Sequence, residues 1–387
     1  MGGTDNIVNA MTIMQAAIMP AIAVAVVEGQ SHQSVLPPTD IIEEYMEDVI
    51  QEFDLQIDLG KRKADDSVSL FARNKRQMVK YNRVRALKAV REDYLDTRPI
   101  FNDRQFECVF RIKRYLVDDL LGKLVNHSSF WTSTVDACGQ KSIDPYVKVL
   151  AAQKMICYGV SVSAFHDYFQ MGESTGRLCV SMLCRHIVEC DDISAYYLRF
   201  PTKQDARNIT NLHKRQHGID GMMGSLDVTK VHWANCPTAW HGQFKGKEGI
   251  PTISLEAVVD YNLWIWHSAF GFPDSLNDLN IWEKSPLLNS MTDGTNNEID
   301  FPFIIDGQQF AELFYLVDGI YPWLSRFLLT VKDPTTFVDK FYASFQEAAR
   351  KAIERAFGVW KRKFLSVGNS VRLHYRDDIF FLVKATI

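Results

Sequence analysis

The sequence predicts an α+β protein in which a helical amino-terminal region is followed by a mixed β-sheet. Apolar side chains recur at helical spacing through residues 101–200, and short apolar runs of strand length replace them after about Gly224. Asp227 and Asp318 each end one of these runs, and Glu354 lies on a later helical pattern rich in Ala, Arg and Lys. We therefore expect two strands and one helix to bring three carboxylates together.

The amino-terminal part of the chain differs in charge from the rest. The net charge is −4 over 387 residues, yet residues 1–60 hold ten Asp or Glu and no Lys or Arg, whereas residues 61–91 hold eleven Lys or Arg and two Asp. We expect residues 1–60 to be an acidic, poorly ordered tail with a helix near Thr39–Phe53, and residues 61–100 to be a basic helical segment. Such a segment forms either a solvated helix face or a contact surface for phosphates.

An apolar stretch, Ile7–Val27, is long enough to suggest a signal peptide or a membrane span. It lacks a basic flank, and Asn9, Thr12 and Pro20 interrupt it, so we expect a tail or a short docked helix and no membrane partner. The seven cysteines form no disulfide framework, which suits a reducing compartment.

Residues 101–222 are expected to form a helical domain that contains a helix-turn-helix-like unit. Helices are expected over Phe106–Leu124, Tyr146–Tyr158, Ser163–Phe169 and from the turn at Met171–Thr175 to about Glu189. A helix, a Gly-containing turn and a capped helix in this order match the helix-turn-helix layout, and a plain helical bundle fits equally well. If the unit binds DNA, the exposed start of its last helix offers Ser174, Thr175 and Arg177.

Cys179, Cys184, His186 and Cys190 raise the question of a zinc site within the same segment. They contain no CxxC pair and interleave with apolar residues at helical spacing, so buried thiols are expected instead of zinc ligands.

Residues 223–387 are expected to fold as a mixed sheet packed with helices. Strands are predicted at Leu226, Ile253–Tyr261, Leu263–Phe270 and Phe314–Val317, and helices at Asp278–Lys284, Tyr321–Leu328 and Val338–Phe364. The two middle strands would form a hairpin that turns at Asn262.

The three carboxylates predict a metal site more strongly together than any one of them does alone, because a lone Asp or Glu is usually a solvated surface charge. Carboxylate oxygens suit Mg²⁺, with Mn²⁺ as a substitute, and two ions would clamp the attacking and leaving oxygens of a phosphodiester. Asp227 would be the central ligand, with Asp318 on one ion and Glu354 on the other.

Several cations share the helix of Glu354 and would either grip phosphates or form a solvated face. They are Arg350, Lys351, Arg355, Lys361, Arg362 and Lys363. His232 and His267 are candidates for proton transfer or for simple packing within the strands. Trp240, beside His241 in a polar loop, is the tryptophan most expected to contact DNA.

The motifs around the carboxylates resemble the PIF/Harbinger transposases, the plant transposon protein type, from about Arg91 to Phe364. They occur in the family's order: His232-Trp233-Ala234-Asn235, Leu255-Glu256-Ala257-Val258-Val259, Leu263-Trp264-Ile265-Trp266-His267, Gly271-Phe272-Pro273, Leu276-Asn277-Asp278-Leu279-Asn280, Leu316-Val317-Asp318-Gly319-Ile320-Tyr321-Pro322 and Glu354-Arg355-Ala356-Phe357-Gly358. By this resemblance Asp227, Asp318 and Glu354 match the family's DDE metal-binding triad. Asp278 matches a further acidic position close to the same site.

The resemblance implies an RNase H-like catalytic core in residues 223–387. It implies a nuclear, metal-dependent DNA endonuclease or transposase that hydrolyses phosphodiesters and carries out strand transfer. The implied partners are double-stranded DNA at transposon ends or target sites, a Myb-like DNA-binding protein and further copies of the same chain.

Two departures from the family pattern support an alternative. Val228-Thr229-Lys230-Val231 precede His232, which suggests that Lys230 competes with the metals. The chain stops at Ile387, before the family's usual end, so a missing carboxy-terminal helix is expected. The alternative is a domesticated or decayed transposase-derived protein that binds DNA without cleaving it.

Overall fold

The computed structural model describes residues 79–135, 139–246, 249–276, 278–305 and 307–387. The expected acidic tail, its helix near Thr39–Phe53 and the cations before residue 79 lie outside the described residues. From Tyr81 onward the described residues belong to one structural unit. None of the helices described is long and apolar enough to cross a membrane.

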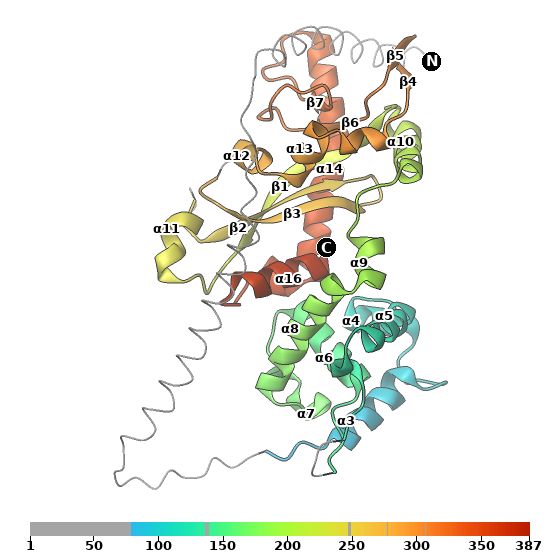
Figure 1. Cartoon of the computed structure of the whole chain (residues 1–387), viewed down its shortest axis with the longest axis vertical. Helices are drawn as coiled ribbons and strands as arrows, with labels where there is room; N and C mark the ends of the chain where they lie inside the picture. The colour runs from blue at the N-terminus through green and yellow to red at the C-terminus, as the bar shows by residue number, and fades with distance from the viewer. Residues whose placement is uncertain (1–78, 136–138, 247–248, 277, 306) are drawn as a thin grey trace. The chain divides into compact units, whose positions relative to one another are not determined.

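The first part of this unit is helical (Figure 1). Its elements are α3 (Arg83–Val90), the π-helix η1 (Arg91–Leu95), α4 (Asp103–Phe110), α5 (Arg114–His127), the 3₁₀-helix η2 (Ser129–Trp131), α6 (Pro145–Tyr158), the 3₁₀-helix η3 (Val162–Ala164), α7 (His166–Phe169), α8 (Glu173–Glu189) and α9 (Asp191–Tyr197). Helix α6 confirms its prediction and follows ordinary capping chemistry. Asp144 accepts from the Tyr146 amide, Pro145 occupies the first turn and Gly159 ends the helix at φ 63°.

The single helix expected over Phe106–Leu124 is wrong, because the chain turns between α4 and α5. Arg111 adopts a left-handed conformation with φ 57° and caps α4. Phe106 and Phe110 pack their rings against Tyr94, with centroids 5.7 and 5.0 Å away. The turn lets α5 bury its own apolar face, formed by Val117, Leu121 and Leu124.

Helix α10 (Lys203–His217) leads into a five-stranded mixed sheet with strand order β3-β2-β1-β6-β7. The strands are β1 (Met222–His232), β2 (Thr252–Val259), β3 (Ile265–Pro273), β6 (Phe314–Val317) and β7 (Phe327–Leu329). β1, β2 and β3 are antiparallel neighbours, whereas β6 runs parallel to β1, and β7 runs parallel to β6. The predicted hairpin between β2 and β3 is confirmed, and Leu263 completes its turn with φ 69°.

The helix predicted over Tyr321–Leu328 is wrong. After Asp318 the chain makes an irregular turn through Pro322 and then enters β7. Phe327, Leu328 and Leu329 are all buried and pair with Tyr315, Leu316 and Val317. Three consecutive buried apolar residues fit a parallel strand covered on both faces, and tertiary pairing decides this over local helical spacing.

The remaining short elements surround the sheet. They are η4 (Thr238–Trp240), α11 (His241–Phe244), α12 (Asp278–Trp282), α13 (Pro286–Thr292), η5 (Thr295–Ile299) and the separate pair β4 (Phe303–Ile305) and β5 (Gln308–Phe310). Helix α12 begins at Asp278, as predicted.

A long helix, α14 (Phe337–Lys363), crosses the sheet, as its sequence predicts (Figure 1). Thr336 and Asp339 form a capping box at its start, and Lys361, Arg362 and Lys363 lie in its last turn, where they complement the helix dipole. It buries Ile353, Ala356, Phe357 and Trp360 in the same cluster as Leu255, Ala257 and Val259 of β2. This packing turns the apolar side of α14 toward the sheet, and Arg350 and Lys361 at its margin reach β1.

Two carboxy-terminal helices, α15 (Leu365–Gly368) and α16 (Arg376–Thr386), return the chain to the helical part. Ser181 of α8 donates to the Asp378 carboxylate at 3.4 Å, and Arg185 of α8 lies 4.8 Å from the ring centroid of Phe381. Lys384 of α16 also donates to the Ser268 carbonyl of β3 at 2.5 Å. Helix α16 therefore joins the sheet to the helical part.

Candidate active site

Asp227 lies on β1, and Asp318 immediately follows the neighbouring parallel strand β6. Ser225 of β1 is in register with Leu316 of β6, so two residues further along each strand the two aspartates are level. Both side chains are half-buried. In each aspartate, one carboxylate oxygen accepts a hydrogen bond from the next backbone amide. Val228 N–H donates to Asp227 Oδ1 at 2.8 Å, and Gly319 N–H donates to Asp318 Oδ1 at 2.6 Å.

Glu354 lies on α14, on the same flank of the helix as two side chains that contact β1. Arg350 is one turn before it and Lys361 two turns after it, so the three residues share one helix face. Arg350 reaches Asp227, and Lys361 donates to Thr229 Oγ1 at 2.9 Å and to the Lys230 carbonyl at 2.8 Å. Glu354 itself is exposed. Its convergence with the two aspartates stays a prediction.

Arg350 contacts the Asp227 carboxylate. Its Nη1 donates to Asp227 Oδ2 at 3.0 Å, and the two side chains are only 15% and 23% exposed. Lys361 is likewise committed to β1, and burial lowers its pKa. Of the six cations predicted to grip phosphates, Arg350 and Lys361 therefore hold the helix against the sheet. Lys351, Arg355, Arg362 and Lys363 are exposed.

Lys230 does not approach the carboxylates, contrary to the expectation that it would compete with metals there. Side chains alternate along β1, so Asp227 and Thr229 face α14 whereas Lys230 faces the other side of the sheet. There Lys230 Nζ lies 2.6 Å from the buried Asp274 Oδ1.

The same alternation places His232 and His267 on the sheet face opposite Asp227, so neither side chain is positioned to transfer a proton at the carboxylates. His267 pairs across the strands with Val258, and its Nε2 lies 3.2 Å from Glu256 Oε2. Glu256 also accepts a short hydrogen bond from Ser285, the residue that caps α13. The buried contacts of Glu256 with His267 and Ser285 therefore attach the start of α13 to β2 and β3.

Asp278 opens α12, but its side chain lies outside the part of the chain that the structure describes. Its role as a further acidic ligand stays a prediction.

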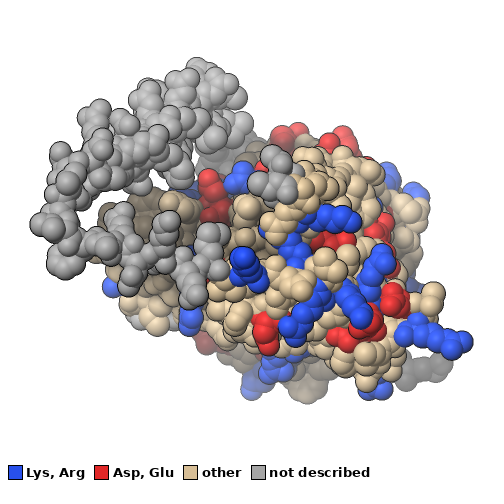
Figure 2. Space-filling model, turned by 90° about the horizontal axis from the view of Figure 1, so that it is seen from below, with Lys and Arg blue, Asp and Glu red and all other residues tan. Residues whose placement is uncertain are grey.

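The helix-turn-helix-like segment consists of α6, η3–α7 and α8. Helix α8 begins at Glu173, with Gly172 as its cap, within the Met171–Thr175 segment expected to form the turn. Ser174 and Arg177 are exposed, Thr175 is half-buried, and Arg177 pairs with Glu173 at 3.3 Å. Figure 2 shows Lys and Arg interspersed with Asp and Glu on the face seen from below. None of these observations tests DNA binding by α8, so that role stays a prediction.

The cysteines of α8 are confirmed as buried thiols. Cys179, Cys184 and Cys190 are each at most 3% exposed. Burial raises the pKa of Cys179 and of Cys184 to about 12, so both remain protonated and are poor zinc ligands.

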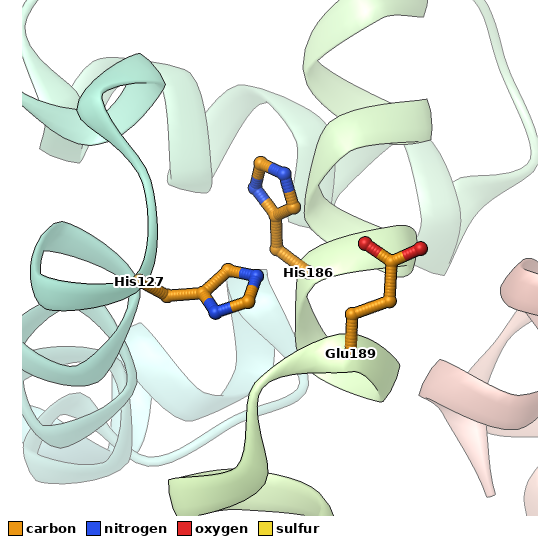
Figure 3. A group of neighbouring side chains, drawn as sticks. All are labelled: His127, His186 and Glu189. Carbon is orange, nitrogen blue, oxygen red and sulfur yellow. The ribbon is translucent and has the colours of Figure 1, made fainter.

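One other group in the described residues has the composition of a metal site: His127, His186 and Glu189 (Figure 3). Possible ligand atoms of the three lie within 4.8 Å of one another. However, Trp131 Nε1–H donates to His186 Nδ1 at 2.8 Å. An indole N–H only donates, so Nδ1 is an acceptor and the neutral ring carries its proton on Nε2. That proton occupies the lone pair a metal would need, and the Trp131 bond therefore opposes metal binding by His186.

Comparison with known proteins supports the resemblance given by the motifs. Residues 195–387 match the family model described as plant transposon protein. No curated protein and no solved structure matches the chain. The matched region contains every strand of the sheet, the Asp227–Asp318 pair and the whole of α14.

Proposed function

Residues 195–387 belong to the plant transposon protein family, and from that premise we propose that this chain is a divalent-metal-dependent DNA nuclease of the DDE transposase type. The observation that carries the proposal is the register of β1 and β6, which sets Asp227 on β1 level with Asp318 just after β6, next to α14, the helix that contains Glu354. The strand order β3-β2-β1-β6-β7, with three antiparallel strands followed by two parallel ones, supports an RNase H-like core.

The donor set fits divalent cations. Asp227, Asp318 and Glu354 offer hard carboxylate oxygens, and the two aspartates are held by their strands and by backbone amides. These three residues would hold two Mg²⁺ or Mn²⁺ ions, with Asp278 as a further ligand. When bound, the ions supply an activated water and charge neutralisation at the phosphate.

The protein's own groups would orient the DNA. The exposed cations Lys351, Arg355 and Arg362 lie on the same helix as Glu354 and would contact phosphates beside the cut strand. Ser174, Thr175 and Arg177 at the start of α8 would make a second contact with duplex DNA. Strand transfer, a nuclear location, a Myb-like partner and a further copy of this chain are additional proposals that follow from the family resemblance.

Nicking of supercoiled plasmid by the purified chain tests this function. We expect nicked circles with Mg²⁺ or Mn²⁺ and none with EDTA. Asp227→Asn is the sharpest variant, because the amide oxygen still accepts a hydrogen bond from Arg350 while the charge that holds a metal is lost. Nicking by Asp227→Asn at the wild-type rate would refute the assignment.

A second candidate function is a transposase-derived protein that binds DNA without cleaving it. The contact between Arg350 and Asp227 favours it, since a guanidinium already neutralises the central carboxylate. Metal binding separates the two functions. Calorimetric titration with Mn²⁺ should show binding that Asp227→Asn abolishes if the chain is a nuclease, and no binding to either protein if it is a relic.

A further inference from the structure

A surface cavity of about 410 Å³ lies between α9–α10 and the β2–β3 hairpin. We call it the aromatic groove and define it by Tyr196, Arg199, Asn208, Arg215, Trp264 and Trp266, which line it. Its volume falls within the roughly 300–1,000 Å³ typical of small-molecule sites. The proposed cleavage chemistry uses none of these residues.

Aromatic rings meet in this groove and remain open to solvent. Trp264 stacks on Tyr197 at 6.0 Å and an angle of 21°, and Tyr196 lies edge-on to Trp264 at 6.3 Å. Trp266 is tilted against Trp264 at 5.8 Å. Tyr196 is 60% exposed and Trp264 is 37% exposed. A protein rarely leaves several clustered aromatic rings exposed unless they bind something.

Buried contacts hold the rings in place. Asp260 is 4% exposed and accepts hydrogen bonds from the Trp264 amide at 3.1 Å and from Trp266 Nε1 at 3.0 Å. Arg199 lies over the Trp266 ring, 5.6 Å from its centroid, and pairs with Asp205 at 2.6 Å. The two acids of the groove are thus engaged by protein donors, and the rings are fixed before any ligand arrives.

Polar side chains of α10 continue the groove into a second cavity of about 380 Å³. Asn208 and Arg215 line both cavities, and Asn211 and Lys214 line the second. The hairpin also reaches toward α14, because Arg355, the neighbour of Glu354, lies 5.5 Å from the ring centroid of Tyr261. The β2–β3 hairpin thus lines the groove and also contacts the helix that carries Glu354.

We propose that the aromatic groove binds unpaired nucleotides of a DNA strand. Exposed rings stack on bases of any sequence, amides reach base edges, and the Arg215 guanidinium contacts a backbone phosphate. A base inside a duplex has both faces covered by its neighbours, so only an unpaired base can use Tyr196 and Trp264. The proposal takes from the proposed function only that the ligand is DNA.

Binding of fluorescein-labelled oligothymidylate, about 12 nucleotides long, tests the proposal by fluorescence anisotropy in EDTA. EDTA removes metals, so the result does not depend on cleavage. We expect Tyr196→Ala and Trp264→Ala each to weaken binding roughly 5- to 100-fold, the usual effect of removing one stacked ring. Tyr115→Ala is the matched control, since Tyr115 is also an exposed helical tyrosine, at 63% against 60% for Tyr196. It should bind like wild type.

Three further variants complete the test, and the first of them guards against a folding defect. Trp264→Phe keeps a ring and should restore most of the affinity lost in Trp264→Ala. Arg215→Ala should flatten the dependence of log K on log salt by about 0.7, the value for one phosphate contact on a single strand. Arg104→Ala, at an exposed arginine of α4, should leave the slope unchanged.

Several outcomes would overturn the proposal. They are no measurable oligothymidylate binding, equal losses in Tyr196→Ala and Tyr115→Ala, and failure of Trp264→Phe to recover affinity. Equal losses of affinity for duplex and for single-stranded DNA in Tyr196→Ala and Trp264→Ala would also overturn it, and would indicate a general DNA-binding surface. Failure of the groove is distinguishable from failure of the nuclease, because Asp227→Asn should lose nicking yet bind the oligonucleotide in EDTA as wild type does.

Discussion

Arg350 on α14 donates to the carboxylate of Asp227 on β1 at 3.0 Å, although the two residues are 123 positions apart in the sequence. The contact sets the Arg350 guanidinium against the carboxylate that the proposed metal site needs as its central ligand. It holds α14 against β1 and keeps a half-buried acid neutralised before metal binds. A metal bound at the proposed site would therefore compete with Arg350 for this carboxylate.

Removal of the Arg350 guanidinium should make the stability of the folded protein depend more strongly on bound metal. Arg350→Ala leaves Asp227 beside Asp318 without its cation, so we expect thermal stability in EDTA to fall by about 1–3 kcal/mol. Mg²⁺ should then raise the melting temperature more than it does in wild type. Lys351→Ala, which removes the exposed neighbouring cation, is the control and should respond to Mg²⁺ as wild type does. A smaller Mg²⁺ response in Arg350→Ala would contradict the competition.

Loss of either aspartate should stop cleavage without weakening the binding of duplex DNA. We expect Asp227→Asn and Asp318→Asn to lower Mg²⁺-dependent nicking by roughly 10³-fold or more, since a bound metal contributes several kcal/mol of charge stabilisation to the transition state. Duplex affinity, measured in EDTA by anisotropy, should stay at the wild-type value. Glu107→Gln, at an exposed acid of α4, should change neither quantity. Nicking that survives in Asp318→Asn would remove this residue from the site.

The exposed cations of α3 should contribute to duplex binding through phosphates. Deleting the basic segment would also remove the buried Ala86 and Val90, so charge substitution is the cleaner test. We expect the double variant Arg85→Gln/Lys88→Gln to flatten the slope of log K against log salt by about 1.8. Arg83→Gln is the control, because Arg83 Nη1 donates to the Lys141 carbonyl at 2.5 Å. An unchanged slope in the double variant would assign duplex binding to α8 or α14.

Acid should destabilise the protein through His213 on α10. This side chain is fully buried, and burial together with the charge of His217 lowers its pKa to about 4. Below about pH 6.5 the unfolded chain takes up a proton that the folded chain refuses until about pH 4, so stability is lost across that window, by up to roughly 3 kcal/mol. His213→Leu should lose less stability between pH 7 and pH 4.5 in urea titrations, whereas His166→Leu, at an exposed site, should behave as wild type. Equal acid sensitivity in both variants would assign the effect to other groups.

The helices and strands with strong local signals were predictable. Phe314–Val317 is a continuous apolar run before Asp318, and α14 has a capping box and a long apolar stripe, so both appear where the sequence places them. β7 was missed because its three residues become a strand only by pairing with β6. The turn at Arg111 was missed because α4 and α5 carry one continuous apolar pattern across it.

Part of the candidate site was predictable in the same way. Asp227, Asp318 and Glu354 stand out by position and by the motifs around them. The orientation of Lys230 was not predictable, since a shift of one residue along a strand reverses the face on which a side chain lies. Trp240, the tryptophan expected to contact DNA, packs against Trp233 and Phe244, whereas Trp264 and Trp266 line a groove.

The sequence by itself determined which residues are proposed to carry the chemistry and where most of the main helices and strands lie, because periodicity, caps and turns depend on near neighbours. Tertiary structure alone decided that Arg350 meets Asp227, that Lys230 turns away to Asp274, and that Tyr196 meets Trp264. Each of these contacts joins residues distant in the sequence. Strand register and helix packing set them, and those depend on how the whole chain buries its apolar surface.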